Sequence, residues 1–176
     1  MQFLPTVNQL VALGTLTLQF FILLVGLLFL SKKKYWLHDF ISKNILIICF
    51  DIVLASVLIS LYYSDIIGFA PCILCWYQRI FLYPLLPMFA LAIWKKDRGI
   101  IRYALVLSAL GFLVGVYHNL IYYFNVLPLP CAATGVSCTQ HLVSEYNGFI
   151  SIPMMSMTAF LILIVLMISA KLKPHD

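Results

Sequence analysis

The sequence predicts an all-α integral membrane protein, a four-helix transmembrane bundle plus one extra N-terminal transmembrane helix. The first observation is composition, because 64% of the 176 residues are hydrophobic, 10% are charged and the mean hydropathy is +1.04. A soluble domain is roughly half apolar and about a quarter charged. The second is the presence of five apolar stretches, each near the roughly 20 residues that cross a bilayer. The third is that the basic residues fall in alternate loops.

Five spans are expected in order along the chain. Residues 1–31 carry no charged side chain, and the apolar stretch at about 10–30 is the first span. The other spans are expected at about 44–63 (with Asp51), 75–94 (with Arg79, Pro84 and Pro87), 103–124 and 149–170. The loops are too short for a separate soluble domain. We therefore expect an extra helix with a basic loop (1–43) and a four-helix bundle with two cysteine-containing loops (44–176).

The loop charges orient these spans in the membrane. Five crossings place ten of the eleven Lys and Arg residues on one side, which the positive-inside rule makes the cytoplasm. The N-terminus is then outside, the C-terminus is inside, and loops 64–74 and 125–148 are extracytoplasmic. No basic segment precedes the first span, so we expect a retained helix rather than a cleaved signal peptide. The net charge of +5 follows from this topology and does not indicate a nucleic-acid partner.

The placement of the cysteines agrees with this orientation. Cys72, Cys75, Cys131 and Cys138 lie in the extracytoplasmic loops or at a helix mouth, whereas Cys49 lies within the second span. On an oxidising face, four cysteines are enough for two disulfides. Cys49 is expected to be a packing residue, because a buried cysteine behaves as a small apolar side chain.

A Cys72-X-X-Cys75 motif stands at the start of the third span, directly after Pro71. This spacing lets the two thiols close a small disulfide ring. Cys75 is expected in the first helical turn, where free backbone N–H groups and the helix dipole favour an anion. Arg79 follows at i+4 and faces the same side of the helix. Both effects favour a thiolate at Cys75, the form that exchanges disulfides or gives up electrons.

Two further polar side chains lie inside predicted spans. An arginine at mid-membrane costs about 2.5–3.5 kcal/mol on insertion scales, so Arg79 needs an explanation. It either extends toward the headgroups or donates hydrogen bonds to a polar ligand within the bundle. His118 lies near the outer end of the fourth span, at a depth similar to that of Arg79. It is either a helix–helix hydrogen-bonding residue or part of the same site.

The second cysteine pair, Cys131 and Cys138, lies in the loop before the last span with six residues between its members. That spacing exceeds the two to four residues typical of a zinc knuckle, so we expect no metal site. One alternative is a purely structural disulfide, and another is a zinc site built from all four loop cysteines. Two disulfides at one membrane face favour a relay, in which one pair meets a partner protein and the other meets an electron acceptor.

These features together resemble the DsbB family of membrane thiol–quinone oxidoreductases, including its shorter BdbC-like members. The resemblance covers about residues 45–170, or four of the five spans. Its most specific element is a motif at the head of a core helix, and a histidine and a cysteine pair follow it in the expected order. These residues are Pro71-Cys72-X-X-Cys75-X-Tyr77-X-Arg79, His118, and the Cys131/Cys138 pair.

The resemblance implies an enzyme, a protein-dithiol:quinone oxidoreductase of the bacterial cytoplasmic (inner) membrane. Its redox-active disulfides would be Cys72–Cys75 and Cys131–Cys138. Cys75 would face a bound quinone, either ubiquinone or menaquinone, and Arg79 and His118 would contact it. A DsbA-like thioredoxin-fold oxidase would attack Cys131, and Cys138 would then exchange with Cys72. These cysteines would carry electrons from the partner protein to the membrane quinone pool.

Three features of this chain depart from the family pattern. The first span is additional, the loop between Cys131 and Cys138 is short, and Gln78 stands where some relatives have an acid. A second candidate family is that of vitamin K epoxide reductase, also quinone-linked, but there the loop cysteines precede the Cys-X-X-Cys motif. A third reading is a structural or transport protein whose two disulfides only hold its loops.

The relay predicts that Cys75→Ser abolishes the reduction of quinone by a reduced thioredoxin-fold partner. Cys49→Ser is the control, because Cys49 belongs to neither pair and its loss should leave turnover unchanged. The measurement is quinone reduction by the purified protein. Normal turnover by the Cys75→Ser variant would exclude the proposed role, and lower stability without a quinone-dependent defect would favour purely structural disulfides.

Overall fold

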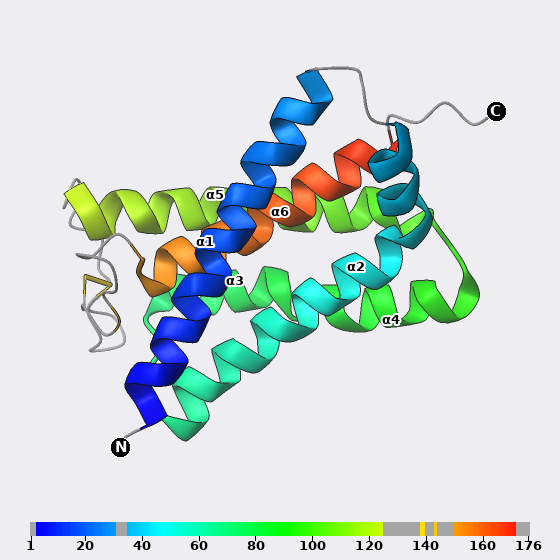
Figure 1. Cartoon of the computed structure of the whole chain (residues 1–176). Coiled ribbons are helices and arrows are strands. Elements are labelled where there is room, and N and C mark those ends of the chain that lie inside the picture. Colours follow the sequence, from blue (N-terminus) through cyan, green and yellow to red (C-terminus); the bar gives the residue numbers. More distant parts are fainter. Residues whose placement is uncertain (1–2, 31–34, 125–137, 140–142, 144–149, 172–176) are drawn as a thin grey trace.

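The computed structural model describes residues 3–30, 35–124, 138–139, 143 and 150–171. All of the elements in these ranges are helices, so the all-α prediction is confirmed. They are α1 (Phe3–Leu30), α2 (Tyr35–Leu61), the short π-helical segment η1 (Tyr62–Ile66), α3 (Ile73–Leu82), α4 (Leu85–Lys95), α5 (Ile100–Phe124) and α6 (Ile152–Lys171) (Figure 1).

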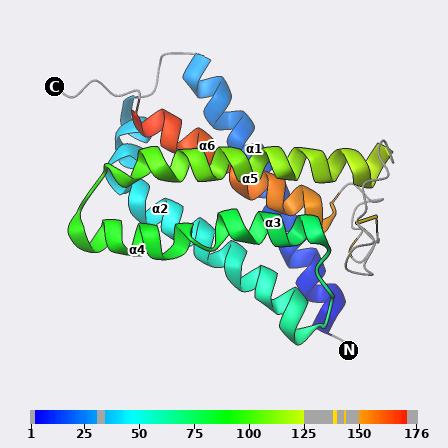
Figure 2. The same cartoon turned by 180° about the vertical axis from the view of Figure 1, so that it is seen from behind.

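Four helical segments are long and apolar enough to cross a membrane. They are Thr6–Leu24, Ile41–Ile66, Ile100–Phe124 and Ile152–Ala170. The predicted third span is present as two shorter helices, α3 and α4, which lie end to end (Figure 2). Together with this pair, the described helices make the extra N-terminal span and the four spans of the expected bundle. The protein is therefore a multi-pass membrane protein.

Two prolines explain why the third span is broken. Pro84 has no N–H group to donate to the carbonyl of Ile80, and Pro87 has none to donate to the carbonyl of Tyr83. The Tyr83 carbonyl instead accepts from the N–H of Leu86 at 3.2 Å, an i+3 bond that tightens the chain. As a result α3 ends at Leu82 and α4 begins at Leu85. The expected third span, at about 75–94, contained both prolines but was a single uninterrupted helix.

The helix ends divide into two groups at opposite ends of the bundle. The starts of α1, α3 and α6 and the end of α5 lie at one end, at the left of Figure 1 and the right of Figure 2. The α4–α5 turn lies at the other end, where the guanidinium of Arg98 donates to the carbonyl of Lys43 at 3.5 Å. A basic residue of α2 and one of the α4–α5 turn therefore meet at one end, as alternating crossings require.

The main core lies between α2, α4, α5 and α6. On α2, Ile45, Cys49 and Val53 recur at i+4 intervals, and all three are fully or almost fully buried. They pack against residues of the facing helices, among them Phe89 of α4 and Phe160 of α6. Cys49 is a free thiol within this core, which agrees with its expected packing role. Asp51, by contrast, lies on the exposed side of α2.

α1 is attached to this bundle by side-chain contacts. The amide of Gln19 donates to the hydroxyl of Thr158 on α6 at 3.0 Å, and the hydroxyl of Tyr63 donates to the side-chain oxygen of Asn8 at 2.8 Å. Leu18, next to Gln19 on this helix, packs against the main core. The extra helix is therefore fixed against α6 and against the segment that follows α2.

Close packing of α5 on α6 depends on two glycines. A Cβ atom at Gly111 would overlap the ring of Phe160, and one at Gly115 would lie 3.3 Å from the backbone of Met157. Gly111, Gly115 and His118 lie on one buried face of α5, at i, i+4 and i+7. The glycines thus bring α6 close to the helix face that also carries His118.

We predict that Gly111→Ala destabilises the protein by about 1–3 kcal/mol, because its methyl group overpacks a fully buried ring. Gly14→Ala on α1 is the matched control, since a Cβ atom there meets nothing within 4 Å. The unfolding midpoint of each purified variant in detergent measures the effect. The penalty should shrink when Phe160→Leu makes room, and equal midpoints for the two alanine variants would contradict the packing argument.

Candidate functional site

The start of α3 positions the two motif cysteines. Cys72 is the N-cap residue, with extended backbone angles (φ −70°, ψ 169°), and its sulfur accepts a hydrogen bond from the N–H of Cys75 at 3.4 Å. The first helical residue is Ile73, which places Cys75 in the first turn as predicted. A capping side chain satisfies one of the N–H groups that a helix start leaves without a partner. The capping function is thus performed by a redox-active type of side chain.

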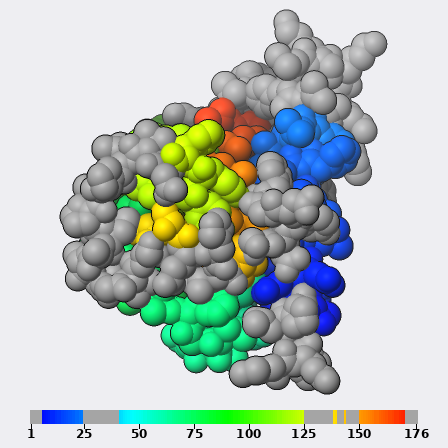
Figure 3. All heavy atoms as spheres, turned by 90° about the vertical axis from the view of Figure 1, so that its left-hand side faces the viewer, coloured from blue at the N-terminus to red at the C-terminus, as the bar shows by residue number. Residues whose placement is uncertain are grey.

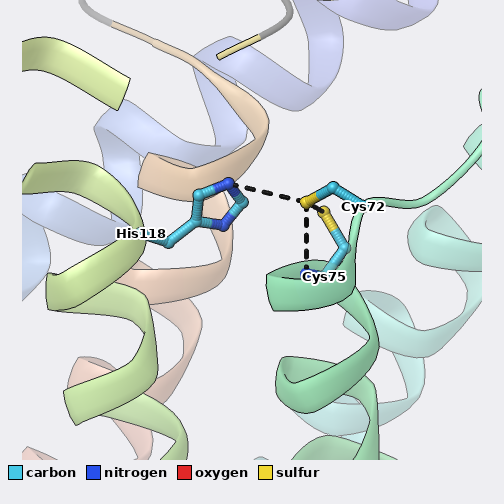
Figure 4. A group of neighbouring side chains, drawn as sticks. All are labelled: Cys72, Cys75 and His118. Atoms are coloured by element: carbon cyan, nitrogen blue, oxygen red, sulfur yellow. Dashed lines mark hydrogen bonds between the residues drawn. The ribbon is translucent and has the colours of Figure 1, made fainter. Parts of the chain in front are cut away.

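The two thiols contact each other and an imidazole. The sulfur atoms of Cys72 and Cys75 are 3.0 Å apart, and both residues are free thiols in this structure. The Nε2 atom of His118, on α5, lies 3.8 Å from the sulfur of Cys72 (Figure 4). The structure therefore brings together three residues that the sequence analysis proposed for one site.

Gln78 orients the imidazole from the other side. Its amide nitrogen lies 3.5 Å from Nδ1 of His118, and both side chains are buried. An amide N–H group can only donate, so Nδ1 is the acceptor in this pair and Nε2 carries the proton. The imidazole thereby directs its Nε2–H group at the sulfur of Cys72. Gln78 therefore acts as a positioning residue for His118.

Cys72 is consequently the better-stabilised thiolate. The Cys75 thiol, then His118 and the N–H of Cys75, hold the pKa of Cys72 at about 4, well below the ordinary thiol value of 9.0, although burial opposes them. Arg79, meanwhile, makes its hydrogen bonds away from the dithiol. The predicted preference for a Cys75 thiolate is wrong for this reduced pair, in which Cys72 is the sulfur with the lowered pKa.

Arg79 is anchored across the bundle on α2. Its Nε–H group donates to the hydroxyl of Ser60 at 3.0 Å, and an Nη2–H group donates to the Ser60 carbonyl at 3.0 Å. The guanidinium carbon also lies 5.4 Å from the ring centre of Trp76 and 6.0 Å from that of Tyr83. These contacts hold the side chain in place, and no acceptor among the described residues is bonded to the Nη1 group, which can donate to a ligand.

The second cysteine pair is described only in part. Cys138 is in a disulfide and is buried, whereas its predicted partner Cys131 lies outside the described residues. Cys138 belongs to the same small apolar cluster as Cys72, together with Leu74 and Ile121. The described residues of this loop, yellow in Figure 3, lie at the end of the molecule that exposes the end of α5. Cys72 therefore has a disulfide sulfur as a neighbour in its own cluster.

A cavity of about 570 Å³ adjoins this group. Its walls include all of the described candidate residues, namely Cys72, Cys75, Arg79, His118 and Cys138. Apolar side chains of α2 and α6 form much of the remaining wall, with a few hydroxyl groups among them. Ligand sites in proteins are typically of this size and kind, with a small number of polar groups in an apolar cavity.

Metal binding is a weaker use of the same side chains. The ligand atoms of Cys72, Cys75 and His118 lie within 4.8 Å of one another, so they could approach one ion. Two thiolates at the usual Zn–S distance in a tetrahedral site would stand roughly 3.7 Å apart. The observed sulfur separation of 3.0 Å is shorter than this. The geometry is closer to a dithiol ready to form a disulfide.

Two of these roles, those of Ser60 and Gln78, were not predicted from the sequence. Ser60 was not singled out, because a serine in an apolar span gives no sign of which residue it will meet. Gln78 was noted only as a departure from related sequences. Its position three residues after Cys75 and one before Arg79 could have suggested a place in the site, since i+3 residues share a helix face.

Most of this chain is similar in sequence to a known protein family. The family model described as "Disulfide bond formation protein DsbB" matches residues 42–170. The chain belongs to the DsbB family. Among its relatives, the "Probable disulfide formation protein C 2" of Bacillus cereus is 36% identical over 73% of this chain and 91% of its own length. The "SPbeta prophage-derived disulfide bond formation protein B" of Bacillus subtilis is 38% identical over 67% of this chain and 79% of its own length.

Family membership makes this protein a membrane oxidoreductase that acts in disulfide bond formation. A third relative, the "Probable disulfide formation protein" of Metapseudomonas resinovorans, is 35% identical over 71% of this chain and 88% of its own length. No solved structure is similar enough to match. The family match begins after α1, so that helix stands outside the part of the chain shared with the family model.

We predict that reduced protein retains the ultraviolet absorbance of a thiolate down to about pH 5 and loses it as pH falls through about 4, since Cys72 has a lowered pKa. Cys75→Ala should move this transition to higher pH by removing the principal hydrogen-bond donor, and His118→Ala should move it less. Cys72→Ser should remove the signal, whereas Cys49→Ser should not. A thiolate that forms only above about pH 8, as in an ordinary cysteine, would contradict this assignment.

Proposed function

We propose that this protein reoxidises a DsbA-like, thioredoxin-fold thiol oxidase and passes the electrons to membrane quinone. The observation that carries the proposal is the single cavity that adjoins the Cys72–Cys75 dithiol, Arg79 and the disulfide-bonded Cys138. A purely structural pair of disulfides would need neither a cavity nor an arginine in the wall of that cavity.

The residues in this cavity fit a quinone. A quinone ring is apolar on both faces and has carbonyl oxygens that accept hydrogen bonds. The cavity supplies apolar walls, an Nη1 group of Arg79 with unused N–H groups, and the thiol of Cys75. Oxidation of the dithiol to a disulfide releases two electrons and two protons, which convert one quinone to one quinol. Ubiquinone and menaquinone present the same carbonyl pattern to these donors.

Thiol exchange would bring electrons to this dithiol. The partner dithiol reduces the Cys131–Cys138 disulfide through attack on Cys131, and the partner becomes oxidised. The freed Cys138 thiolate then attacks Cys72 in the Cys72–Cys75 disulfide, with Cys75 as the leaving thiolate. Cys131 displaces Cys72 to restore the loop disulfide, which leaves the inner pair reduced. Packing of Cys138 and Cys72 in one cluster supports this route.

The low pKa of Cys72 suits that sequence of exchanges. A sulfur with a stabilised thiolate is a good leaving group, so Cys131 can release Cys72 readily at neutral pH. His118, oriented by Gln78, would stabilise the released thiolate through its Nε2–H group. His118 and Gln78 thus favour completion of the exchange, so the mixed disulfide between Cys138 and Cys72 does not accumulate.

We also propose the orientation and location expected from the sequence. Arg98 and Lys43 lie together at the end of the bundle opposite the dithiol, and positive charge marks the cytoplasmic side. The N-terminus and the cysteine loops are then extracytoplasmic and the C-terminus is cytoplasmic. This orientation, in the bacterial cytoplasmic membrane, gives the dithiol access to a thiol oxidase outside and to quinone in the bilayer.

The proposal predicts that purified protein in lipid nanodiscs reduces a short-chain quinone only when reduced partner oxidase is present. Arg79→Met should raise the KM for quinone at least about tenfold, or about 1.4 kcal/mol, because it removes the N–H donors. Its KM for the partner should not change. Ultraviolet absorbance of the quinone follows the reaction.

Arg102→Met is the matched control, because Arg102 is exposed at the opposite end of the bundle. It should leave both KM values at the wild-type level. Partner oxidation that proceeds equally fast without quinone would overturn the proposed acceptor. An unchanged quinone KM in Arg79→Met would overturn the role of the arginine.

A further inference from the structure

Helix α1 forms one wall of the cavity that adjoins the dithiol. Six of its residues line that cavity, namely Leu10, Val11, Gly14, Thr15, Thr17 and Leu18. The opposite parts of the wall carry Cys75 and Arg79 of α3. A segment that precedes the family match therefore contributes directly to the site where the proposed chemistry takes place.

Polar contacts at two points along α1 fix the position of this wall. Near the start of α1, Asn8 accepts a hydrogen bond from Tyr63, and further along Gln19 donates to Thr158. Thr15, between them, is buried, and its hydroxyl donates to the carbonyl of Val11 within the helix. Hydrogen bonds between helices are effective in an apolar environment, where water does not compete for the same groups. α1 is thus held beside the cavity.

A second, outer groove lies next to the cavity, on the side between α1 and α2. This groove has a volume of about 480 Å³, with walls that include Val7, Leu58 and Tyr62. Val11 and Ile59 line both the groove and the cavity, so these two side chains stand between them. The groove is mostly apolar, with Asp65 as the charged residue in its wall, and opens on the outside of the bundle, where Leu58 is 57% exposed.

We propose that α1 is part of the quinone-binding site and that quinone reaches the dithiol through the gap between α1 and α2. This inference rests on the proposed function. Its specific observation is that only the side chains of Val11 and Ile59 stand between the outer groove and a cavity lined by Cys75 and Arg79. The quinone ring would lie by these two residues, and its isoprenoid tail would extend along α1 past Gly14 toward the lipid. An apolar tail matches the apolar residues of both walls.

Gly14 is the position at which this inference can be tested. It lines the cavity, and a Cβ atom added there meets nothing within 4 Å, so a larger side chain has room to enter the open space. Leu13 is adjacent in sequence, is 52% exposed and does not line the cavity. The same bulky residue at these two positions therefore compares a cavity wall with a lipid-facing surface on one helix.

The experiment compares Gly14→Ala, Gly14→Leu and Gly14→Trp with Leu13→Trp. We expect the Kd of a short-chain quinone, measured by isothermal titration calorimetry in nanodiscs, to rise with side-chain size at position 14. Gly14→Trp should bind at least about tenfold more weakly than wild type and retain less co-purified quinone by mass spectrometry. Leu13→Trp should match wild type in both respects. The KM for the partner oxidase should be the same in all variants.

Three outcomes would overturn the inference. Equal quinone affinity in Gly14→Trp and Leu13→Trp, with active wild-type protein, would remove α1 from the site and leave the proposed function intact. A lowered unfolding midpoint of Gly14→Trp relative to Leu13→Trp, together with normal binding by Gly14→Leu, would assign the effect to folding. Failure of wild-type protein itself to bind and reduce quinone would end the proposed function, and the inference with it.

Discussion

The cap at the start of α3 is the constraint on which the rest of the site depends. A helix that begins near an apolar bundle must satisfy its first N–H groups, and here the Cys72 sulfur accepts from the N–H of Cys75. That one contact fixes the backbone of the motif and brings the two sulfur atoms within 3.0 Å of each other, so that the Cys75 thiol, with His118, can make Cys72 the favoured anion. It also sets the rotation of α3, which determines where Gln78 and Arg79 point.

The surrounding helices hold two other groups against this cap. The glycine face of α5 lets α6 approach closely, and His118 stands on that same face two turns beyond Gly111. From α2, Ser60 holds the guanidinium of Arg79 by two hydrogen bonds. The proline break separates α3 from α4, so the first half of the third span can follow these contacts while α4 packs into the main core.

Several of these features could be predicted from the sequence, and the reasons differ from residue to residue. Composition and the roughly 20-residue apolar stretches were enough for the all-α membrane fold. The spacing of Cys72 and Cys75 after Pro71 was enough for the helix start, because capping is a local property. The ionised sulfur was predicted wrongly, since the choice between two adjacent thiols depends on the hydrogen bond between them and on His118, neither of which spacing reveals. Ser60 was missed because its partner lies 19 residues away along the chain.

The anchor of Arg79 has an electrical consequence. Ser60 is neutral, so the two hydrogen bonds that hold the guanidinium leave its positive charge uncompensated, whereas a carboxylate would have cancelled it. In a medium of low dielectric constant, such a charge acts strongly on neighbouring groups. It favours any acceptor in the cavity that gains negative charge, and so raises the acceptor's reduction potential relative to that of the dithiol. Because its anchor on α2 is a neutral serine, Arg79 keeps its full positive charge available to groups in the cavity.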